Sequence, residues 1–187
     1  MRRGNLFVIS GPSGAGKGTL VARLLDELPD AWVSVSATTR KPRPGEVHGT
    51  HYFFLSNDEF DDLVAHDGLL EWASYSGNRY GTPRASVEER VAAGDQVILE
   101  IEVQGAFQVK ERMPFAHLVF VEPPSLDELR RRLEGRGTED AAAIELRMRT
   151  AEIELARKHE YDYCLVNDDL ERALGELVDY VNEQAER

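Results

Sequence analysis

The segment that most constrains this chain is the glycine-rich run Gly11-Pro-Ser-Gly-Ala-Gly-Lys-Gly-Thr19. It follows an apolar run at 6–9 and precedes apolar residues at helical spacing over 20–25, which predicts a strand, a loop and a helix in that order. Glycines let such a loop turn its N–H groups toward phosphate oxygens, and the helix adds the partial positive charge of its N-terminus. Lys17 has the spacing at which this motif contacts the β- and γ-phosphates of a nucleoside triphosphate. We therefore predict a nucleotide-phosphate site; a glycine-rich turn with a chance lysine is the weaker alternative.

The last position of the motif departs from its general form. That position normally carries Ser or Thr to hold Mg²⁺, whereas here Gly18 takes its place and Thr19 follows. The Gly-Lys-Gly-Thr ending resembles nucleoside monophosphate kinases, and that resemblance implies a Mg²⁺ held largely by phosphates and water. We expect Mg²⁺ as the cofactor that accompanies ATP, assign no residue as a direct metal ligand, and leave a contact from Thr19 open.

Composition narrows the class of protein. The 187 residues suffice for one domain with insertions, and a net charge of −12 argues against a nucleic-acid binder, which needs a basic face. We expect no membrane segment, because no apolar run approaches the length of a span, and no secretion signal, because the first apolar run is short. The single cysteine, Cys164, excludes an internal disulfide and is expected to pack within a buried strand. These features favour a cytoplasmic protein; its oligomeric state stays open.

Strand and helix patterns alternate along the chain. Apolar runs expected as strands lie at 6–9, 32–35, 52–54, 69–75, 97–102, 117–121 and 163–166. Alternation with helices predicts an α/β fold with a parallel sheet flanked by helices. The exception is the segment 36–82, where a Pro- and Gly-rich loop and short apolar runs predict an insertion with its own small sheet.

Local signals predict where several helices begin. Ser56-Asn-Asp-Glu59 and Ser125-Leu-Asp-Glu128 have the form of capping boxes. Thr82-Pro83 is typical of an N-cap followed by proline in the first turn, and Asn167 or Asp168 is expected to cap the last helix.

Arginines gather in two irregular segments. Arg40 and Arg43 flank a proline, and their forked guanidinium groups match phosphate geometry. Arg132, Arg136, Arg147 and Arg149 lie in and on either side of the Gly-Arg-Gly break at 135–137, as on a flap. A surface ion pair is the alternative for any single arginine, but a chain that already carries a phosphate loop favours arginines that close over transferring phosphate.

Two carboxylates end the apolar strand at 97–102. Alternation is expected to place Glu100 and Glu102 on one face, at the sheet edge where nucleotide-binding folds hold ligands. They would orient water on Mg²⁺ or contact the acceptor, and the alternative is an acidic strand end without a role. His48 and His51 have ligand-like spacing, but a solvated loop pair is favoured because no cysteine or acidic partner completes a zinc set.

Four stretches of the chain resemble the guanylate kinase family, and the resemblance covers nearly all of it. They are 11–19, Ser36-Ala-Thr-Thr-Arg-Lys-Pro-Arg-Pro-Gly-Glu46, Leu133-Glu-Gly-Arg-Gly-Thr-Glu139 and Val166-Asn-Asp-Asp-Leu170. The resemblance implies the P-loop kinase fold, as one domain with a core over 1–35, 83–127 and 159–187, a GMP-binding subdomain over 36–82 and a helical lid over 128–158. It also implies ATP and GMP, with dGMP as a further acceptor, as the partners of a phosphoryl transfer.

The resemblance implies roles for individual residues as well. ATP would bind Gly11, Pro12, Ser13, Gly14, Ala15, Gly16, Lys17, Gly18 and Thr19, with Asn167 near the adenine. The GMP phosphate would be held by Arg40, Arg43, Tyr52 and Tyr80, and the guanine would face Ser36, Glu71 and Thr82. Glu100 and Glu102 would lie on the GMP side, where the family commonly has at least one Asp, so their detailed role is open. Lys17, Arg136 and Arg147, supported by Arg132, would be the catalytic residues.

Two other functions stay open at this point. A non-catalytic module of the same family would use the GMP pocket for a phosphorylated peptide, but it would have no need of Lys17, Arg136 and Arg147. A kinase for another small phosphate acceptor would have no need of Ser36, Glu71 and Thr82 together.

Overall fold

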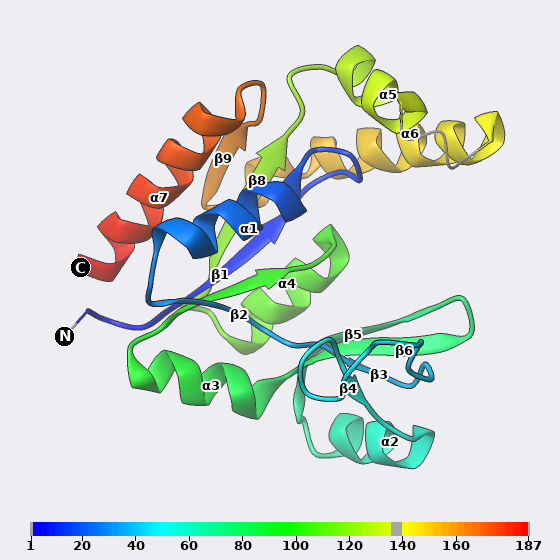
Figure 1. Ribbon diagram of the computed structural model, residues 1–187, viewed down its shortest axis with the longest axis vertical. Helices are drawn as coiled ribbons and strands as arrows, with labels where there is room; N and C mark the ends of the chain where they lie inside the picture. The colour runs from blue at the N-terminus through cyan, green and yellow to red at the C-terminus, as the bar shows by residue number, and fades with distance from the viewer. Residues whose placement is uncertain (1, 136–139, 187) are drawn as a thin grey trace.

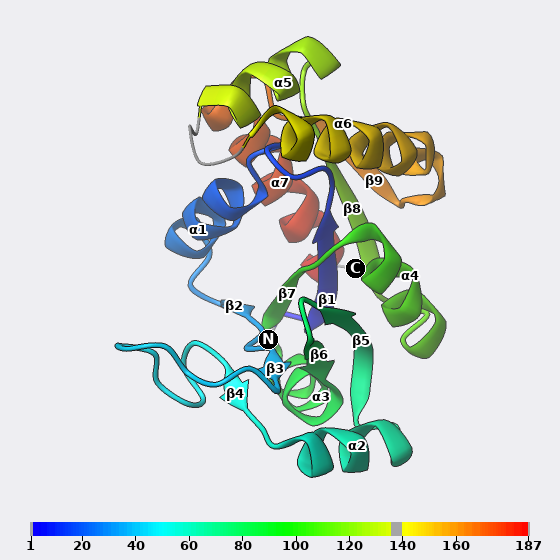
Figure 2. The ribbon, with the colours of Figure 1, turned by 90° about the vertical axis from the view of Figure 1, so that its right-hand side faces the viewer.

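The computed structural model describes residues 2–135 and 140–186. These residues form a main sheet of five parallel strands in the order β2-β7-β1-β8-β9. The strands are β1 (Asn5–Ser10), β2 (Ala31–Val33), β7 (Gln96–Glu100), β8 (His117–Glu122) and β9 (Tyr163–Val166). Figures 1 and 2 show helices on both faces of this sheet, which confirms the predicted parallel sheet flanked by helices.

The central strand β1 is buried along its whole length because each of its faces is covered. Phe7 and Ile9 pack against α1 (Lys17–Glu27) and α7 (Leu170–Glu186). Leu6 and Val8 point the other way, as alternation along a strand requires, and pack with α3 (Arg84–Ala93) and α4 (Val103–Arg112). The strand therefore delivers its carboxyl end, and the phosphate loop that follows, on a rigid support.

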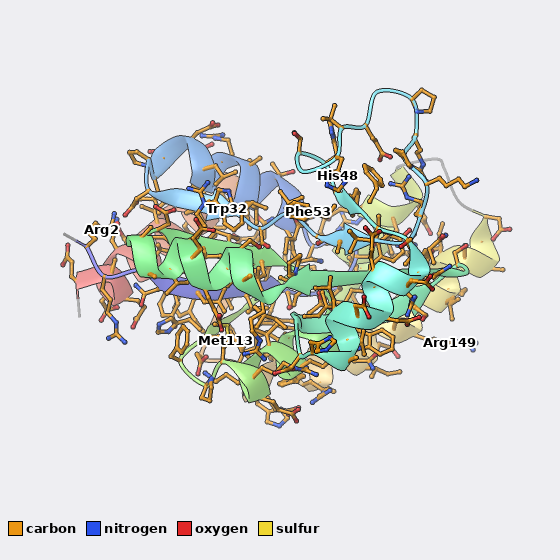
Figure 3. The ribbon with its side chains drawn as sticks, turned by 90° about the horizontal axis from the view of Figure 1, so that it is seen from below. Arg2, Trp32, His48, Phe53, Met113 and Arg149 are labelled. Carbon is orange, nitrogen blue, oxygen red and sulfur yellow. The ribbon has the colours of Figure 1, made fainter. Side chains whose placement is uncertain are left out.

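A second sheet lies at one end of the molecule (Figures 1 and 2). Its order is β4-β3-β6-β5, with strands β3 (Ala37–Thr38), β4 (Phe53–Phe54), β5 (Leu69–Tyr75) and β6 (Asn78–Pro83). Helix α2 (Asn57–Ala65) packs on it, and the predicted capping box of Ser56 and Glu59 is present. Figure 3 shows His48 beside Phe53, with ring centroids 5.7 Å apart, over this sheet.

Two helices cover the carboxyl end of the main sheet. They are α5 (Leu126–Gly135) and α6 (Ala141–Ala156), followed by the short 3₁₀ helix η1 (Lys158–Glu160). They share a small core of their own, which contains Leu129, Leu133, Ile144 and Met148. Half of the predicted capping box at 125–128 forms: the Ser125 hydroxyl accepts from the Glu128 N–H at 3.1 Å, while the Glu128 carboxylate bonds Arg132.

The structure corrects three local predictions. The strand predicted at 97–102 ends at Glu100, and Glu102 is the N-cap residue of α4. The alternation of side chains along a strand therefore does not put the two carboxylates on one face, contrary to the prediction. Thr82 lies within β6 instead of capping α3, because its hydroxyl is bonded to Glu71. The last helix is capped by Asp169, which accepts from the Arg172 N–H at 2.9 Å.

Cys164 is exposed, contrary to the prediction that it packs in a buried strand. Strand β9 is the last strand of the main sheet, so one of its sides has no neighbouring strand. Among residues 2–135 and 140–186, no helix combines the length and the apolar character that a membrane span requires.

Candidate functional site

The phosphate loop adopts a conformation that its glycines allow. Gly11 and Gly16 have φ of 145° and 92°, in the region that glycine enters readily. A Cβ on Gly11 would lie 2.2 Å from the Val121 carbonyl oxygen of β8, and one on Gly16 would lie 2.3 Å from Asn167 Nδ2. Glycine therefore permits both the turn and the close approach of neighbouring elements.

Lys17 begins α1 and lies across its own loop. Its Nζ donates to the carbonyl oxygens of Gly11, at 2.5 Å, and Pro12, at 3.0 Å. The ammonium group thus lies at the loop, on the side of a cavity of about 680 Å³ that it helps to line.

Side chains from distant parts of the chain converge on this loop. Asn167, which is 7% exposed, donates from Nδ2 to the Ala15 carbonyl at 2.8 Å. Arg132 donates to the Asn167 carbonyl at 3.0 Å, and Arg147 donates to the Ser13 hydroxyl at 2.7 Å. The structure thereby brings three of the predicted residues to the loop. The fourth predicted residue of this group, Arg136, lies outside the described residues.

The cavity over the loop carries charge of both signs. Arg147, Thr150 and Glu154 of α6 line it, together with Glu100 at the end of β7 and Glu102 at the N-cap of α4. Burial raises the pKa of the Glu154 carboxyl, and nearby Lys17 opposes that rise. Sequence reasoning missed Glu154, although its spacing of seven residues from Arg147 places both on one helix face.

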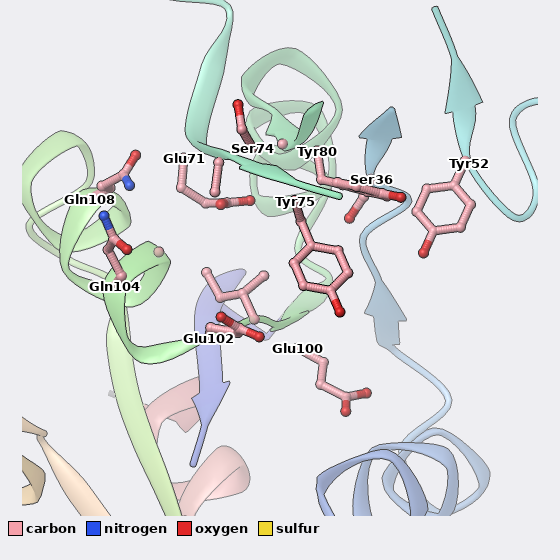
Figure 4. A pocket seen from close by; sticks show the side chains of 14 residues that line it. Ser36, Tyr52, Glu71, Ser74, Tyr75, Tyr80, Glu100, Glu102, Gln104 and Gln108 are labelled. Atoms are coloured by element: carbon pink, nitrogen blue, oxygen red, sulfur yellow. The ribbon is translucent and has the colours of Figure 1, made fainter. Parts of the chain in front are cut away.

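A second cavity, of about 440 Å³, adjoins the first. The two share Tyr75, Glu100, Ile101 and Glu102 as lining residues. Figure 4 shows Ser36, Tyr52, Glu71 and Tyr80 around it, which are residues predicted from the sequence. Tyr75, 74% exposed on the β5–β6 hairpin, lies between the cavities and was not predicted, because an aromatic residue in a strand is usually part of a core.

Glu71 is a buried carboxylate at one end of the second cavity. It is 8% exposed, and its Oε1 accepts a hydrogen bond of 2.7 Å from the Thr82 hydroxyl. The two residues are register partners in β5 and β6. Burial raises the pKa of Glu71, an effect that the Thr82 bond and the charge of Arg112 counteract. Thr82 is itself fully buried, so it acts at this site through the carboxylate.

Arg40 lies beside Tyr52 and Tyr80, which line this cavity. Its guanidinium carbon is 5.4 Å from the centroid of Tyr52, and Nη1 and Nη2 donate to the two Glu46 oxygens at 2.9 and 2.8 Å. The Arg40 bond is the main cause that lowers the Glu46 pKa to about 2. The ion-pair alternative is thus realised for Arg40. Arg43 is exposed, and its N–H donates to Glu46 at 2.7 Å.

Two side chains near the phosphate loop, Glu100 and Thr19, carry oxygen atoms of the kind that bind a metal ion. A Cβ on Gly18 would lie 3.6 Å from the nearer Glu100 oxygen, so that carboxylate lies close to the first turn of α1. Thr19 is exposed on the same turn. In the described part of the chain, no group of three or more His, Cys, Asp or Glu residues is arranged to hold a metal ion.

Known proteins match this chain over nearly its full length. The family model described as guanylate kinase matches residues 3–184. The guanylate kinase of Streptomyces coelicolor is 57% identical over 96% of this chain and 91% of its own length, and that of a Synechococcus strain is 55% identical over 94% and 92%.

A solved structure agrees with these matches. The crystal structure of guanylate kinase from Anaplasma phagocytophilum has a TM-score of 0.75 and 32% identity, and the match covers all of this chain and 88% of the other. With a phosphate loop, a second cavity beside it and these relatives, the chain belongs to the guanylate kinase family.

Proposed function

We propose that this protein transfers the γ-phosphoryl group of ATP to GMP, giving ADP and GDP, and that it also accepts dGMP. The observation that carries the proposal is the junction of the two cavities, one over the phosphate loop and the other beside Glu71. Two nucleotides bound there would bring their phosphates together at the shared wall. This geometry suits in-line transfer, in which positioning and charge neutralisation supply most of the catalysis.

The donor nucleotide binds at the phosphate loop. Loop residues 11–19 surround the phosphates, Lys17 neutralises charge on the β- and γ-phosphates, and Asn167 lies near the adenine. In support, Lys17 is at the loop and lines the larger cavity, while Asn167 is bonded to Ala15 within it. The ammonium group exchanges its loop carbonyls for phosphate oxygens when ATP binds.

The acceptor nucleotide binds in the smaller cavity. Arg40, Arg43, Tyr52 and Tyr80 hold its phosphate, and Ser36 and Glu71 face the guanine. Guanine offers two neighbouring donors, N1–H and the 2-amino group, and one carboxylate can accept a hydrogen bond from each. Adenine presents a lone pair at N1 instead, so the buried Glu71 carboxylate would disfavour it. Thr82 supports that carboxylate from behind.

Closure of two segments completes the site. The subdomain over 36–82 carries the acceptor arginines, and the lid over 128–158 carries Arg132, Arg136 and Arg147, so each binds phosphates at the same junction. Arg147 and Arg136 neutralise the transferring phosphoryl group, and Arg132 supports the lid through Glu128 and Asn167. Closure also excludes water, which would otherwise compete as acceptor. The acceptor is an anionic phosphate and needs no general base.

We expect Mg²⁺ as the cofactor that accompanies ATP. Its preferred ligands are oxygens, several of them from water and phosphate. The carboxylates of Glu100 and Glu102 line the cavity over the loop and fit as partners of such waters, with Thr19 on the adjoining turn as a further candidate. Bound Mg²⁺ would supply charge neutralisation on the β- and γ-phosphates.

An assay of ADP release tests the proposal. The protein is given ATP and Mg²⁺ with GMP, dGMP, AMP, UMP or no acceptor. We expect release with GMP and dGMP and little with the others. Equal release with AMP or UMP would favour a kinase for another acceptor, and no release with any nucleotide would favour a non-catalytic module.

A further inference from the structure

A glycine lies within helix α4 at the wall of the acceptor cavity. Gly105 is buried in the third position of this helix, where glycine destabilises a helix relative to alanine. A Cβ added to it would lie 3.0 Å from Glu71 Oε2 and 3.4 Å from the Glu71 carboxyl carbon. Alanine would therefore press on the carboxylate, and the absence of a side chain lets the helix approach it.

The Glu71 carboxylate is held from its other side by strand β6. Its Oε1 accepts the Thr82 hydroxyl at 2.7 Å, while Oε2 faces Gly105. The group is confined between the helix and the strand, so its direction follows from how close α4 lies.

The same face of α4 also binds the strand that carries Glu71. Gln108 Oε1 accepts from the Trp72 N–H at 3.2 Å, and Arg112 donates from Nη1 to the Leu70 carbonyl at 3.1 Å. The pairing of β5 with β6 is irregular between Leu69 and Glu71, and such a bulge changes the direction of a side chain. Helix α4 thus fixes the backbone on both sides of Glu71. Figure 4 shows Gln104 and Gln108 of this helix facing Glu71.

We propose that Gly105 is a specificity-determining residue, which lets α4 lie against Glu71 and aim its carboxylate at the guanine edge, with Gln108 and Arg112 as positioning residues. The inference rests on the proposed function, because it concerns how the base is recognised. It identifies residues that need not touch the nucleotide, yet decide which base is accepted.

Gly105→Ala should change the acceptor specificity. It should not destabilise α4, because alanine favours a helix more than glycine does. The new methyl group would displace the carboxylate by a few tenths of an ångström, and misplacement of catalytic groups by about 1 Å costs roughly 10²-fold. We expect kcat/KM for GMP to fall about tenfold. Inosine monophosphate lacks only the 2-amino group, so its kcat/KM should fall less. The ratio of the two acceptors should therefore decrease, while the KM for ATP stays within about twofold.

Gly175→Ala is a matched control. Gly175 lies within α7, and in the described part of the chain outside its own helix no heavy atom lies within 4 Å of an added Cβ. This variant should gain helix stability and keep the acceptor ratio of the wild type. Thermal unfolding of all the variants is recorded beside the kinetics.

An unchanged ratio of GMP to inosine monophosphate in folded Gly105→Ala would overturn the inference. If that variant fails to fold, Arg112→Lys decides instead, because it removes the Nη1 donor to Leu70, keeps the positive charge that acts on Glu71, and adds no group to the cavity. An unchanged ratio there would likewise overturn it, and a reduced ratio would support it. Failure of the proposed function is distinguishable, since the wild type would then release no ADP in response to GMP.

Discussion

Replacing Glu71 by glutamine tests how the base is chosen. The side chain is 8% exposed, so the substitution keeps its size and packing while it removes the charge. The Thr82 hydroxyl donates to Oε1 at 2.7 Å, and it will keep an oxygen there in the variant because an amide nitrogen offers no acceptor. The amide nitrogen then occupies the place of Oε2 and meets a donor of guanine.

The magnitude follows from the bonds that change. One charge-assisted hydrogen bond, worth about 1.5–3 kcal/mol, is replaced by opposed donors. The bond that remains becomes neutral and loses roughly 1 kcal/mol. A total near 3 kcal/mol corresponds to about a 10²-fold decrease in kcat/KM for GMP, since 1.36 kcal/mol is a factor of ten.

Stability should move in the opposite direction. Burial raises the pKa of Glu71 above its ordinary value of 4.5. The charged form is therefore disfavoured in the folded state, and this cost develops as pH rises from 4.5 through the folded pKa. Glutamine carries no charge, so at neutral pH the free energy of unfolding of Glu71→Gln should equal or exceed that of the wild type.

The assay measures ADP release at varied GMP, AMP and ATP, together with urea unfolding. We expect a large loss with GMP, a KM for ATP within about twofold, and no loss of stability. Retention of the wild-type kcat/KM for GMP, and of its preference over AMP, in a folded Glu71→Gln protein would refute the assignment of Glu71 to the base.

Three further predictions concern the loop, the closure and an ion pair. Lys17→Ala should lower kcat by about 10²–10³-fold, the size of effect found when one group that stabilises transition-state charge is removed, and a folded variant with near-normal turnover would remove Lys17 from the mechanism. Paired spectroscopic labels on the segments 36–82 and 128–158 should approach one another when ATP and GMP analogues bind together; an unchanged distance with both ligands bound contradicts closure. The Glu46 pKa of about 2 lies below its ordinary 4.5, so its contribution to stability is present above pH 4.5 and is lost as pH falls toward 2. Glu46→Gln should therefore show a smaller decrease in the free energy of unfolding between about pH 5 and about pH 3 than the wild type, and an equal decrease would rule out this role for the pair.

The sequence determined the features that local chemistry controls. The phosphate loop was recognisable because its glycines, its lysine and the flanking strand and helix patterns lie within one short segment. The capping box of Ser56 and Glu59 was predictable for the same reason, since both hydrogen bonds join residues three positions apart. The order of the five strands of the main sheet, and with it the parallel sheet, followed from periodicity along the chain, whereas β3 and β6 of the second sheet were not predicted.

Tertiary structure decided what each side chain contacts. Thr82 has the local form of a helix cap, yet it bonds Glu71 because β5 and β6 pair in that register. Asn167 holds Ala15 across 152 positions of the chain instead of capping the helix that follows it. Glu102 lies where α4 begins, so its place in the site depends on where the preceding strand stops.

Partners from distant segments also explain what sequence reasoning missed. Tyr75 and Glu154 become cavity residues only because the β5–β6 hairpin and helix α6 reach the same junction from different parts of the chain. From the local sequence, Gly105 is an unfavourable residue within a helix. The structure explains it, because an added Cβ would lie against the Glu71 carboxylate of another element. Periodicity reports which face of an element is apolar, whereas burial, charge and reach at a site depend on which elements meet there.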